Sequence, residues 1–294
     1  MTIIQLETFL KITETGNFTS AANLLGYAQS TVTTQIKLLE EELGCRLFER
    51  LGKTVTLTQE GELLAGYAEK ILQTEREIRL EVPAGGEPAG VLKLGVSESL
   101  CYDRMPRVLL EYKKRFPDID IRLSFVTHDM FPAQLKKGNL DLVYSLNPAL
   151  DCPDLKILYD RPEELGFFVS PGHPLAGREK VTEKDLEGIP LLLTSHNCSF
   201  RHMLLDDLEK ASVTPQIALE TSSKEILRQF AANGLGVAFM PEMTVRNELE
   251  KHRLEKLDWS GRAFPVFSRV LVHRDKHVNR AIRELVDIIA EIAG

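Results

Sequence analysis

The chain has 294 residues, 43% of them hydrophobic and 27% charged, a composition typical of a soluble globular protein with two or three domains. Its apolar runs, such as residues 189–193, are far shorter than the roughly 20 residues of a membrane-spanning helix. The N-terminus lacks a secretory signal pattern, so we expect a cytoplasmic protein with no membrane partner. The net charge of −7 gives no general affinity for nucleic acid, and any such binding must come from a local arrangement.

Three short helices are expected at the N-terminus. Apolar side chains at three- and four-residue spacing predict a helix over residues 4–15. Thr19 stands where the N-cap of a second helix belongs, and this helix should stop at Gly26. A third helix should begin near Gln29 and end before Gly44.

The next segment predicts a hairpin followed by a long helix. The sequence LFERLGKTVTLT places a turn between two short strands, and Thr58 can cap a helix over residues 59–80. Apolar side chains repeat along this helix at heptad-like spacing, and they are Leu64, Tyr67, Ile71 and Ile78. One helix cannot bury such a seam by itself, so we expect it to pair with the same helix of another subunit.

The Gly- and Pro-rich residues 82–90 predict a hinge. Beyond them, apolar strands alternate with amphipathic helices in two rounds, which predicts two lobes of an α/β domain with mostly parallel strands. The expected strands are residues 91–96, 119–126, 140–146, 165–170, 189–195, 216–220, 234–241 and 266–272, and the expected helices are residues 105–116, 131–137, 199–210, 224–232 and 277–292.

The second and third helices have the length and the tight turn of a helix-turn-helix, whose second helix lies in the DNA major groove. Amide side chains can bond adenine edges, while Ser and Thr offer short donors, acceptors and a methyl group for thymine. The third helix carries many such side chains, namely Gln29, Ser30, Thr31, Thr33, Thr34 and Gln35. This pattern alone also fits a polar, solvated helix face.

A series of motifs spans residues 6–64: Ala21-Ala22, Gln29-Ser30, Ile36, Leu39-Glu40, Leu43-Gly44, Leu47-Phe48-x-Arg50 and Leu57-Thr58-x-x-Gly61. In order and spacing, these motifs resemble the winged helix-turn-helix of the bacterial LysR-type transcriptional regulators. The rest of the chain resembles the family more loosely, at Phe116-Pro117-Asp118-Ile119, Gly138-x-Leu140-Asp141 and Gly234-Leu235-Gly236-Val237 before Met240-Pro241.

The resemblance implies an α/β protein overall, with a mainly α winged helix-turn-helix and a two-lobed sensor like a periplasmic binding protein. The implied parts are the DNA-binding domain at 1–58, a dimerisation linker helix at 59–81, the hinge at 82–90 and an effector-binding domain at 91–294, with lobe I at about 91–161 and 267–294 and lobe II at about 162–266. The implied partners are promoter DNA with an interrupted palindrome, a small effector, a homodimer or homotetramer, and RNA polymerase if the protein is an activator.

By the same resemblance, Gln29, Ser30, Thr31, Thr33, Thr34 and Gln35 would face DNA, and Arg50 and Lys53 would serve the wing. Two positions depart from the family: many members have a capping Ser where Ala28 stands and an Arg where Thr34 stands. Residues 1–66 carry five basic and eight acidic side chains, a net charge of −3. We therefore expect DNA affinity to depend less steeply on salt than it would for a strongly basic domain.

Three strand-to-helix junctions are rich in small polar residues, at 95–99, 193–200 and 219–224. Such junctions gather exposed amides and a positive helix dipole, and ligands of parallel sheets bind beyond the carboxyl ends of the strands. The effector cleft of the family uses corresponding places, which implies effector contacts at Ser97, Ser99, Thr127, Thr194, Cys198, Ser199 and Thr221. Each of these residues taken alone is better explained as an ordinary helix cap, and their convergence on one crevice is what favours a ligand.

The expected effector is a small polar metabolite bearing a carboxylate or another anionic group. Glu98 and Asp129 lie beside two of the junctions and would oppose an anion unless they point away. Three basic side chains could offset them, and these are Arg104, Arg201 and Lys224.

Four alternatives remain open. A nucleophile elbow at GVSES would give an enzyme, but Ser99 replaces its last Gly and no triad partners are placed, so we expect no catalysis. A thiol switch could use Cys198 near a helix start, with Cys101 or Cys152 as its partner. A metal site could use His196-x-Cys198-x-x-x-His202, whose side chains are suitable metal ligands but lie at cramped spacing. A cytoplasmic solute-binding protein is the fourth alternative, and it would leave the first 64 residues without a role.

The cysteines give no sign of a structural cross-link. Cys45, Cys101, Cys152 and Cys198 are far apart and form no C-x-x-C pair. We expect reduced thiols, no metal and no cofactor.

Overall fold

The computed structural model describes residues 1–51, 54–81, 88–127, 129–148 and 152–293. These residues form two compact units, Met1–Gly90 and Val91–Gly294. Residues 82–87 of the expected hinge lie outside the described residues. Each unit is therefore considered by itself.

The first unit begins with three helices, and they are α1 (Ile3–Thr15), α2 (Phe18–Leu25) and α3 (Gln29–Leu43). The expected N-cap of α2 was wrong, because the cap is Asn17 and not Thr19. The side-chain oxygen of Asn17 accepts hydrogen bonds from the backbone N–H groups of Thr19 and Ser20, so the helix begins one residue earlier than Thr19. Gly26 ends α2 with φ at 71°, a left-handed conformation that favours glycine.

The three helices enclose a common apolar core. Its fully buried side chains include Phe9, Ile12, Val32, Leu39 and Leu47. Burial of side chains of this size stabilises a fold by about 1.5–3 kcal/mol each. Because Val32 and Leu39 point into this core, the opposite side of α3 is left to solvent.

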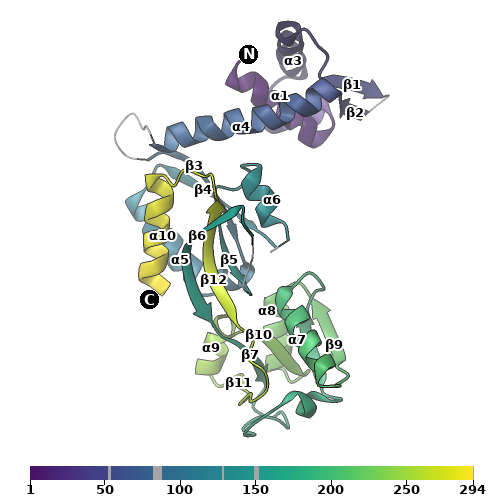
Figure 1. The fold of residues 1–294 in the computed structure, drawn as a ribbon, viewed down its shortest axis with the longest axis vertical. Helices are drawn as coiled ribbons and strands as arrows, with labels where there is room; N and C mark the ends of the chain where they lie inside the picture. The colour runs from purple at the N-terminus through teal and green to yellow at the C-terminus, as the bar shows by residue number, and fades with distance from the viewer. Residues whose placement is uncertain (52–53, 82–87, 128, 149–151, 294) are drawn as a thin grey trace. The chain divides into compact units, whose positions relative to one another are not determined.

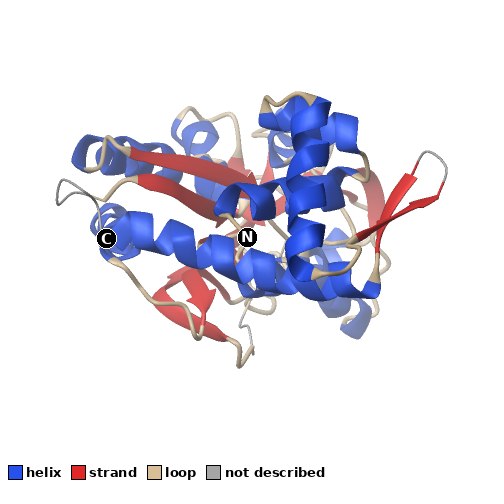
Figure 2. Ribbon diagram, turned by 90° about the horizontal axis from the view of Figure 1, so that it is seen from above, coloured by secondary structure: helices blue, strands red, loops and turns tan. Residues whose placement is uncertain are grey.

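A two-stranded wing and a long helix complete the unit. Strands β1 (Phe48–Leu51) and β2 (Thr54–Leu57) pair antiparallel and extend away from the helices of the unit (Figure 2). The hydroxyl of Thr58 accepts a 3.0 Å hydrogen bond from the backbone N–H of Gly61 and so caps α4 (Gln59–Glu81), as expected. A Cβ atom at Gly61 would meet the carbonyl oxygen of Leu47 at 2.2 Å, so only glycine allows this close approach.

The apolar seam of α4 differs from the expected one. Leu64 and Ile71 pack against the core of the first unit, next to the buried side chains of Ala68 and Leu72. The apolar side chains left in solvent are Leu63, Tyr67 and Ile78, which are 65%, 58% and 55% exposed. The sequence pattern merged two neighbouring faces of the helix, one that packs inward and one that remains open.

The second unit contains two five-stranded sheets (Figure 1). The first sheet has the strand order β4 (Ile119–Phe125), β3 (Gly90–Val96), β5 (Leu142–Asn147), β12 (Val266–His273) and β6 (Leu155–Glu163). The second has the order β11 (Glu255–Lys256), β7 (Leu165–Val169), β10 (Val237–Pro241), β8 (Pro190–Thr194) and β9 (Gln216–Thr221). Each sheet is thus the centre of one lobe.

The sheets are mixed, not mostly parallel as expected. Strand β3 pairs with β5 in parallel, and β8 pairs in parallel with both β9 and β10. Strand β12, which returns to the first sheet from the far end of the chain, is antiparallel to β5 and β6, and β7 is antiparallel to β10 and β11. Strands β7 and β12 each enter their sheet from the other lobe and are antiparallel to their neighbours. The periodicity of apolar residues does not indicate strand direction.

Helices flank both sheets, at Arg104–Arg115 (α5), Phe131–Lys136 (α6), Ser199–Lys210 (α7), Lys224–Ala232 (α8), Arg246–Glu250 (α9) and Arg280–Ala293 (α10), with short 3₁₀ helices at Glu98–Cys101 (η1), Glu183–Leu186 (η2) and Glu242–Thr244 (η3). The buried hydroxyl of Tyr112 on α5 donates a 2.9 Å hydrogen bond to the carbonyl of Ala281 and joins α5 to α10. Among the described residues, no helix is long and apolar enough to cross a membrane.

Candidate functional site

The polar side of α3 faces solvent. The exposed residues on this side are Gln29, Ser30, Thr31, Thr33 and Thr34, while Gln35 is half-buried. Ala28 provides no side-chain cap for α3, in keeping with the absence of a hydroxyl there. The backbone of Arg50 lies in β1, whereas the Arg50 side chain and the whole of Lys53 lie outside the described part of the chain.

Two of the three exposed threonines of α3 use their hydroxyl groups within the helix. Thr33 Oγ1 donates to the carbonyl of Gln29, and Thr34 Oγ1 donates to the carbonyl of Ser30, each at 2.9 Å. With their protons engaged, these hydroxyls keep only acceptor capacity. The outward surface of both side chains is therefore left mainly to the methyl groups.

The two glutamines of α3 are held differently. Gln29 Oε1 accepts a 3.1 Å hydrogen bond from the exposed hydroxyl of Thr19, so its amide NH₂ remains directed to the solvent side. Gln35 Oε1 accepts a 2.5 Å hydrogen bond from Thr8, which is fully buried in α1. Gln35 is thus tied to the interior of the unit, and Gln29 is available at the surface.

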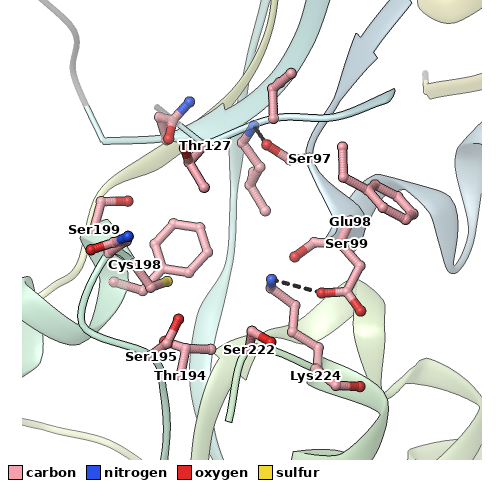
Figure 3. A pocket seen from close by; sticks show the side chains of 17 residues that line it. Ser97, Glu98, Ser99, Thr127, Thr194, Ser195, Cys198, Ser199, Ser222 and Lys224 are labelled. Carbon is pink, nitrogen blue, oxygen red and sulfur yellow. Dashed lines mark hydrogen bonds and ion pairs between the residues drawn. The ribbon is translucent and has the colours of Figure 1, made fainter. Parts of the chain in front are cut away.

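A cavity of about 420 Å³ opens in the second unit (Figure 3). Its wall is built from residues at or just beyond the carboxyl ends of β3, β4, β5, β8 and β9. Six of the seven expected effector residues lie in this wall, and they are Ser97, Ser99, Thr127, Thr194, Cys198 and Ser199. The strand ends of both sheets therefore meet at one place.

Thr221 is the expected residue that does not line the cavity. Its hydroxyl accepts a 3.2 Å hydrogen bond from the backbone N–H of Ser223, and Ser222 and Ser223 line the wall instead. Sequence reasoning also missed Asn147, the last residue of β5, because no helix follows it directly to mark the junction. Ser195 and Asn197 belong to the second junction and could have been included with it.

Two charged side chains line the cavity, and they face each other (Figure 3). Lys224 Nζ, at the start of α8, lies 3.1 Å from Glu98 Oε2, in η1. Tyr102 donates a 2.8 Å hydrogen bond from its hydroxyl to the other oxygen of Glu98. Burial, followed by this hydrogen bond, raises the pKa of Tyr102, so the phenol stays a donor at neutral pH.

The other charged residues considered from the sequence do not reach the wall. Arg104 Nη2 donates to Glu163 at 2.9 Å, and Arg201 Nη1 donates to Glu220 at 2.6 Å and to the carbonyl of Thr194 at 3.0 Å. Asp129 is exposed and outside the lining. Among the described residues of the wall, Lys224 is therefore the one Lys or Arg side chain.

Cys198 lies in the cavity wall at the N-cap of α7, and no side chain caps that helix. All four cysteines are free thiols. His196 is exposed, with Nε2 at 3.3 Å from Glu220, and the described residues contain no group of three or more potential metal-ligating side chains. The arrangement of His196, Cys198 and His202 considered from the sequence does not form such a group.

A winged helix-turn-helix with a polar recognition face, joined in sequence to a two-lobed α/β unit with a polar cavity, defines a DNA-binding regulator with a ligand-sensing domain. Residues 85–294 match the family described as the LysR substrate binding domain, and residues 3–62 match the bacterial regulatory helix-turn-helix protein, lysR family. The chain belongs to the LysR family of transcriptional regulators, which are not enzymes.

Individual relatives agree over nearly the full length. The uncharacterized HTH-type transcriptional regulator YwqM of Bacillus subtilis (strain 168) is 35% identical, covering 98% of each chain. A probable hydrogen peroxide-inducible genes activator of Mycobacterium avium is 30% identical, covering 99% of this chain and 94% of the relative. The solved structure of a full-length OxyR variant from Pseudomonas aeruginosa has the same fold, with a TM-score of 0.74 at 24% identity, covering 100% of this chain and 96% of that one.

Proposed function

We propose that this regulator binds a small polar metabolite with a carboxylate in the cavity of its second unit. The observation that carries the proposal is the meeting of small polar side chains from five strand ends in one cavity. The volume of about 420 Å³ suits a small metabolite. Lys224 and the uncapped first turn of α7 offer positive charge and amide donors to a carboxylate.

The effector acts by preferring one arrangement of the DNA-binding units over another. A ligand with equal affinity for both arrangements would shift nothing, so the cavity must differ between them. The exposed seam of α4 supports pairing of two subunits, which would present two recognition helices to half-sites about one turn of DNA apart. The regulator then acts on promoter DNA in the cytoplasm at an interrupted palindrome, as a dimer or tetramer, and contacts RNA polymerase if it activates.

Gln29, Ser30, Thr31, Thr33 and Thr34 support base contact by their exposure on α3. Gln35 is proposed as a residue that orients α3, because its amide oxygen is held by Thr8. Arg50 and Lys53 remain proposed wing contacts to phosphate on their charge alone.

Two measurements test the proposal. Footprinting on promoter fragments should reveal one protected palindrome, and Gln29→Ala should lower affinity for it about tenfold while affinity for a scrambled duplex is retained. Thermal shift of the full chain with organic acids, amino acids and inorganic anions should identify a stabilising ligand. Absence of sequence-selective binding would overturn the DNA-binding assignment, and absence of any stabilising ligand would overturn the sensor assignment.

A thiol-responsive regulator is the second candidate. Cys198 lies in the cavity at a helix start, where a thiolate is favoured, and one relative is named a hydrogen peroxide-inducible genes activator. Treatment with hydrogen peroxide, followed by mass spectrometry and DNA binding, tests this role. If oxidation of Cys198 changes promoter binding and Cys198→Ser abolishes the change, the thiol is the sensor. If the Cys198→Ser variant responds to a ligand as the parent protein does, the Cys198 thiol is not the sensor.

A further inference from the structure

The charged pair in the cavity wall restricts the kind of ligand that the cavity can hold. Glu98 and Lys224 come from different lobes, since η1 follows β3 of the first sheet and α8 follows β9 of the second. Their side chains are only 26% and 13% exposed. Among the described residues that line the cavity, these two carry the formal charges, so the wall is neutral but strongly polarised.

A ligand with one charge fits this pair poorly. A simple anion that binds Lys224 also meets the carboxylate of Glu98, whose charge lies 3.1 Å away. A simple cation that binds Glu98 meets the ammonium group of Lys224 in the same way. Solvent screening is weak at partly buried positions, so the repulsion cancels much of the attraction.

We propose that the effector is a zwitterion of the α-amino acid class, an inference that rests on the proposed sensor function. Its carboxylate replaces that of Glu98 at Lys224, and its ammonium group replaces that of Lys224 at Glu98. Both protein side chains then keep a partner of opposite charge. The ligand connects the two lobes through Glu98 and Lys224, which pair directly with each other when no ligand is bound. A ligand of this class therefore contacts both lobes at once, and it favours the arrangement of the lobes that allows both contacts.

Neighbouring groups favour this orientation. Tyr102 holds one oxygen of Glu98, so the carboxylate is kept in place while its other oxygen faces Lys224 and the cavity. Ser199 lies in the wall at the start of α7, whose first turn has no side-chain cap and can donate to the carboxylate of the ligand. The rest of the wall combines hydroxyl groups with the apolar side chains of Phe125, Val126, Leu146 and Phe200, which would receive the ligand side chain.

The experiment uses the full chain and two sets of probes. The first set is the twenty common L-amino acids, and each one that binds is compared with its N-acetyl derivative, an anion, and its methyl ester, a cation. The second set is amine-free carboxylates, among them succinate, citrate, pyruvate and benzoate. Calorimetry should show an amino acid that binds at least about tenfold more tightly than both of its derivatives.

Variants separate direct contact from a structural role of the pair. Glu98→Gln and Lys224→Gln should each weaken binding of the amino acid at least about tenfold. Glu98→Gln should also improve binding of the N-acetyl derivative, because the repelling carboxylate is gone; a merely structural role predicts no such gain. Asp160→Asn, which breaks the ion pair with Arg269 outside the cavity, is the matched control and should leave binding unchanged.

The possible results are distinguishable. Binding of carboxylates or N-acetyl derivatives with no binding of amino acids would overturn the zwitterion and leave the proposed sensor function standing. Equal binding of an amino acid and its N-acetyl derivative would also overturn it. If neither set binds at millimolar concentration, the zwitterion and the small-metabolite sensor both fall.

Discussion

Thr8 and Gln35 are joined by a 2.5 Å hydrogen bond from the threonine hydroxyl to the amide oxygen Oε1, which connects α1 to the recognition helix α3. Thr8 is fully buried, so its hydroxyl has no solvent to replace this partner. The bond fixes the rotation of α3 about its axis and thereby the direction of the exposed side chains around Gln29. A buried residue thus controls the direction of the side chains that we propose to contact DNA.

Thr8→Val should therefore weaken both stability and DNA recognition. The variant keeps the shape of the side chain but leaves Gln35 Oε1 without its partner, at a cost of about 1–3 kcal/mol. Hydrogen exchange of α1 and α3 in the full chain measures local stability, and anisotropy with the promoter duplex measures affinity. Thr13→Val is the control, because the Thr13 hydroxyl bonds only the carbonyl of Phe9 in its own helix. Equal effects of the two variants would contradict the role given to Gln35.

Thr33 should contribute to DNA binding through its methyl group. Its hydroxyl is engaged by the carbonyl of Gln29, so Thr33→Val keeps the outward methyl surface and should retain most of the sequence-selective affinity. Thr33→Ser keeps the hydroxyl and loses the methyl, which should lower affinity about fourfold, the equivalent of ~0.8 kcal/mol for one buried carbon. Anisotropy with matched and scrambled duplexes distinguishes the two variants. A larger loss of affinity in Thr33→Val than in Thr33→Ser would show that the hydroxyl contacts the DNA.

Most helices and strands were predictable from the sequence because local signals determine them. Helices α7 and α8 begin and end where the apolar period predicted, since each has an amphipathic face and Ser223 caps the start of α8. Strand β6, at Leu155–Glu163, was missed because four of its nine residues are exposed and the others are only partly buried, and its long pairing with β12 is set by a segment about a hundred residues away. The periodicity of apolar residues in a sequence indicates neither the direction of a strand nor its distant pairing partner.

The candidate site was predictable in part for the same reason. Strand-to-helix junctions can be located in a sequence, and three of them supply most of the cavity wall. The pairing of Glu98 with Lys224 could not be foreseen, because it depends on how the two lobes meet. The sequence placed both residues beside the site but suggested only that one could offset the other.

Tyr67 should belong to a subunit interface along α4. It is 58% exposed, on the same side of the helix as Leu63 and Ile78, which are also exposed. Tyr67→Glu would place a charge in the apolar contact and should raise the dimer dissociation constant more than about tenfold. Sedimentation of the full chain measures this change. Glu62→Lys, which alters charge on a different side of α4, should leave the dimer intact, and a dimer unaffected by Tyr67→Glu would place the interface elsewhere.

Asp207 should make stability depend on pH. It is buried in α7, and burial, followed by the charge of Glu183, raises its pKa, although Arg262 and Lys210 act in the opposite direction. Because the folded-state pKa exceeds the unfolded value, folding takes up a proton between the two, and the free energy of unfolding falls as pH rises through this interval. The carboxylate is therefore destabilising at neutral pH.

Asp207→Asn should accordingly raise the melting temperature at neutral pH, and the gain should shrink as the pH falls through the folded-state pKa of Asp207 toward the ordinary value of 3.8. Fluorescence of Trp259, the single tryptophan, reports melting of the second unit from about pH 8 to about pH 4. Asp206→Asn is the control, since its side chain is exposed on the same helix. A gain that does not change with pH would show that packing, and not ionisation, is responsible.

Glu163 should be essential to the fold of the second unit through its pairing with Arg104. Both side chains are buried, at 8% and 7% exposure, and the hydroxyl of Ser268 also donates to Glu163 at 2.7 Å. Burial acts to lower the pKa of Arg104, but hydrogen bonding to Glu163, followed by the interaction with Tyr144 and the attraction of the Glu163 charge, outweighs burial, so the pKa is raised and the guanidinium stays charged. Removal of the carboxylate would leave a buried charge without a partner.

Glu163→Gln should therefore lower the free energy of unfolding by about 3–5 kcal/mol, measured by urea denaturation with Trp259 fluorescence. The double variant Arg104→Met with Glu163→Leu removes both charges and should recover much of this loss, because two apolar side chains of similar size need no partner. Recovery in the double variant would assign the cost to the unpaired Arg104. If the double variant is less stable than Glu163→Gln, the pair itself provides the stabilisation, and the attraction between the two charges exceeds the cost of burying them.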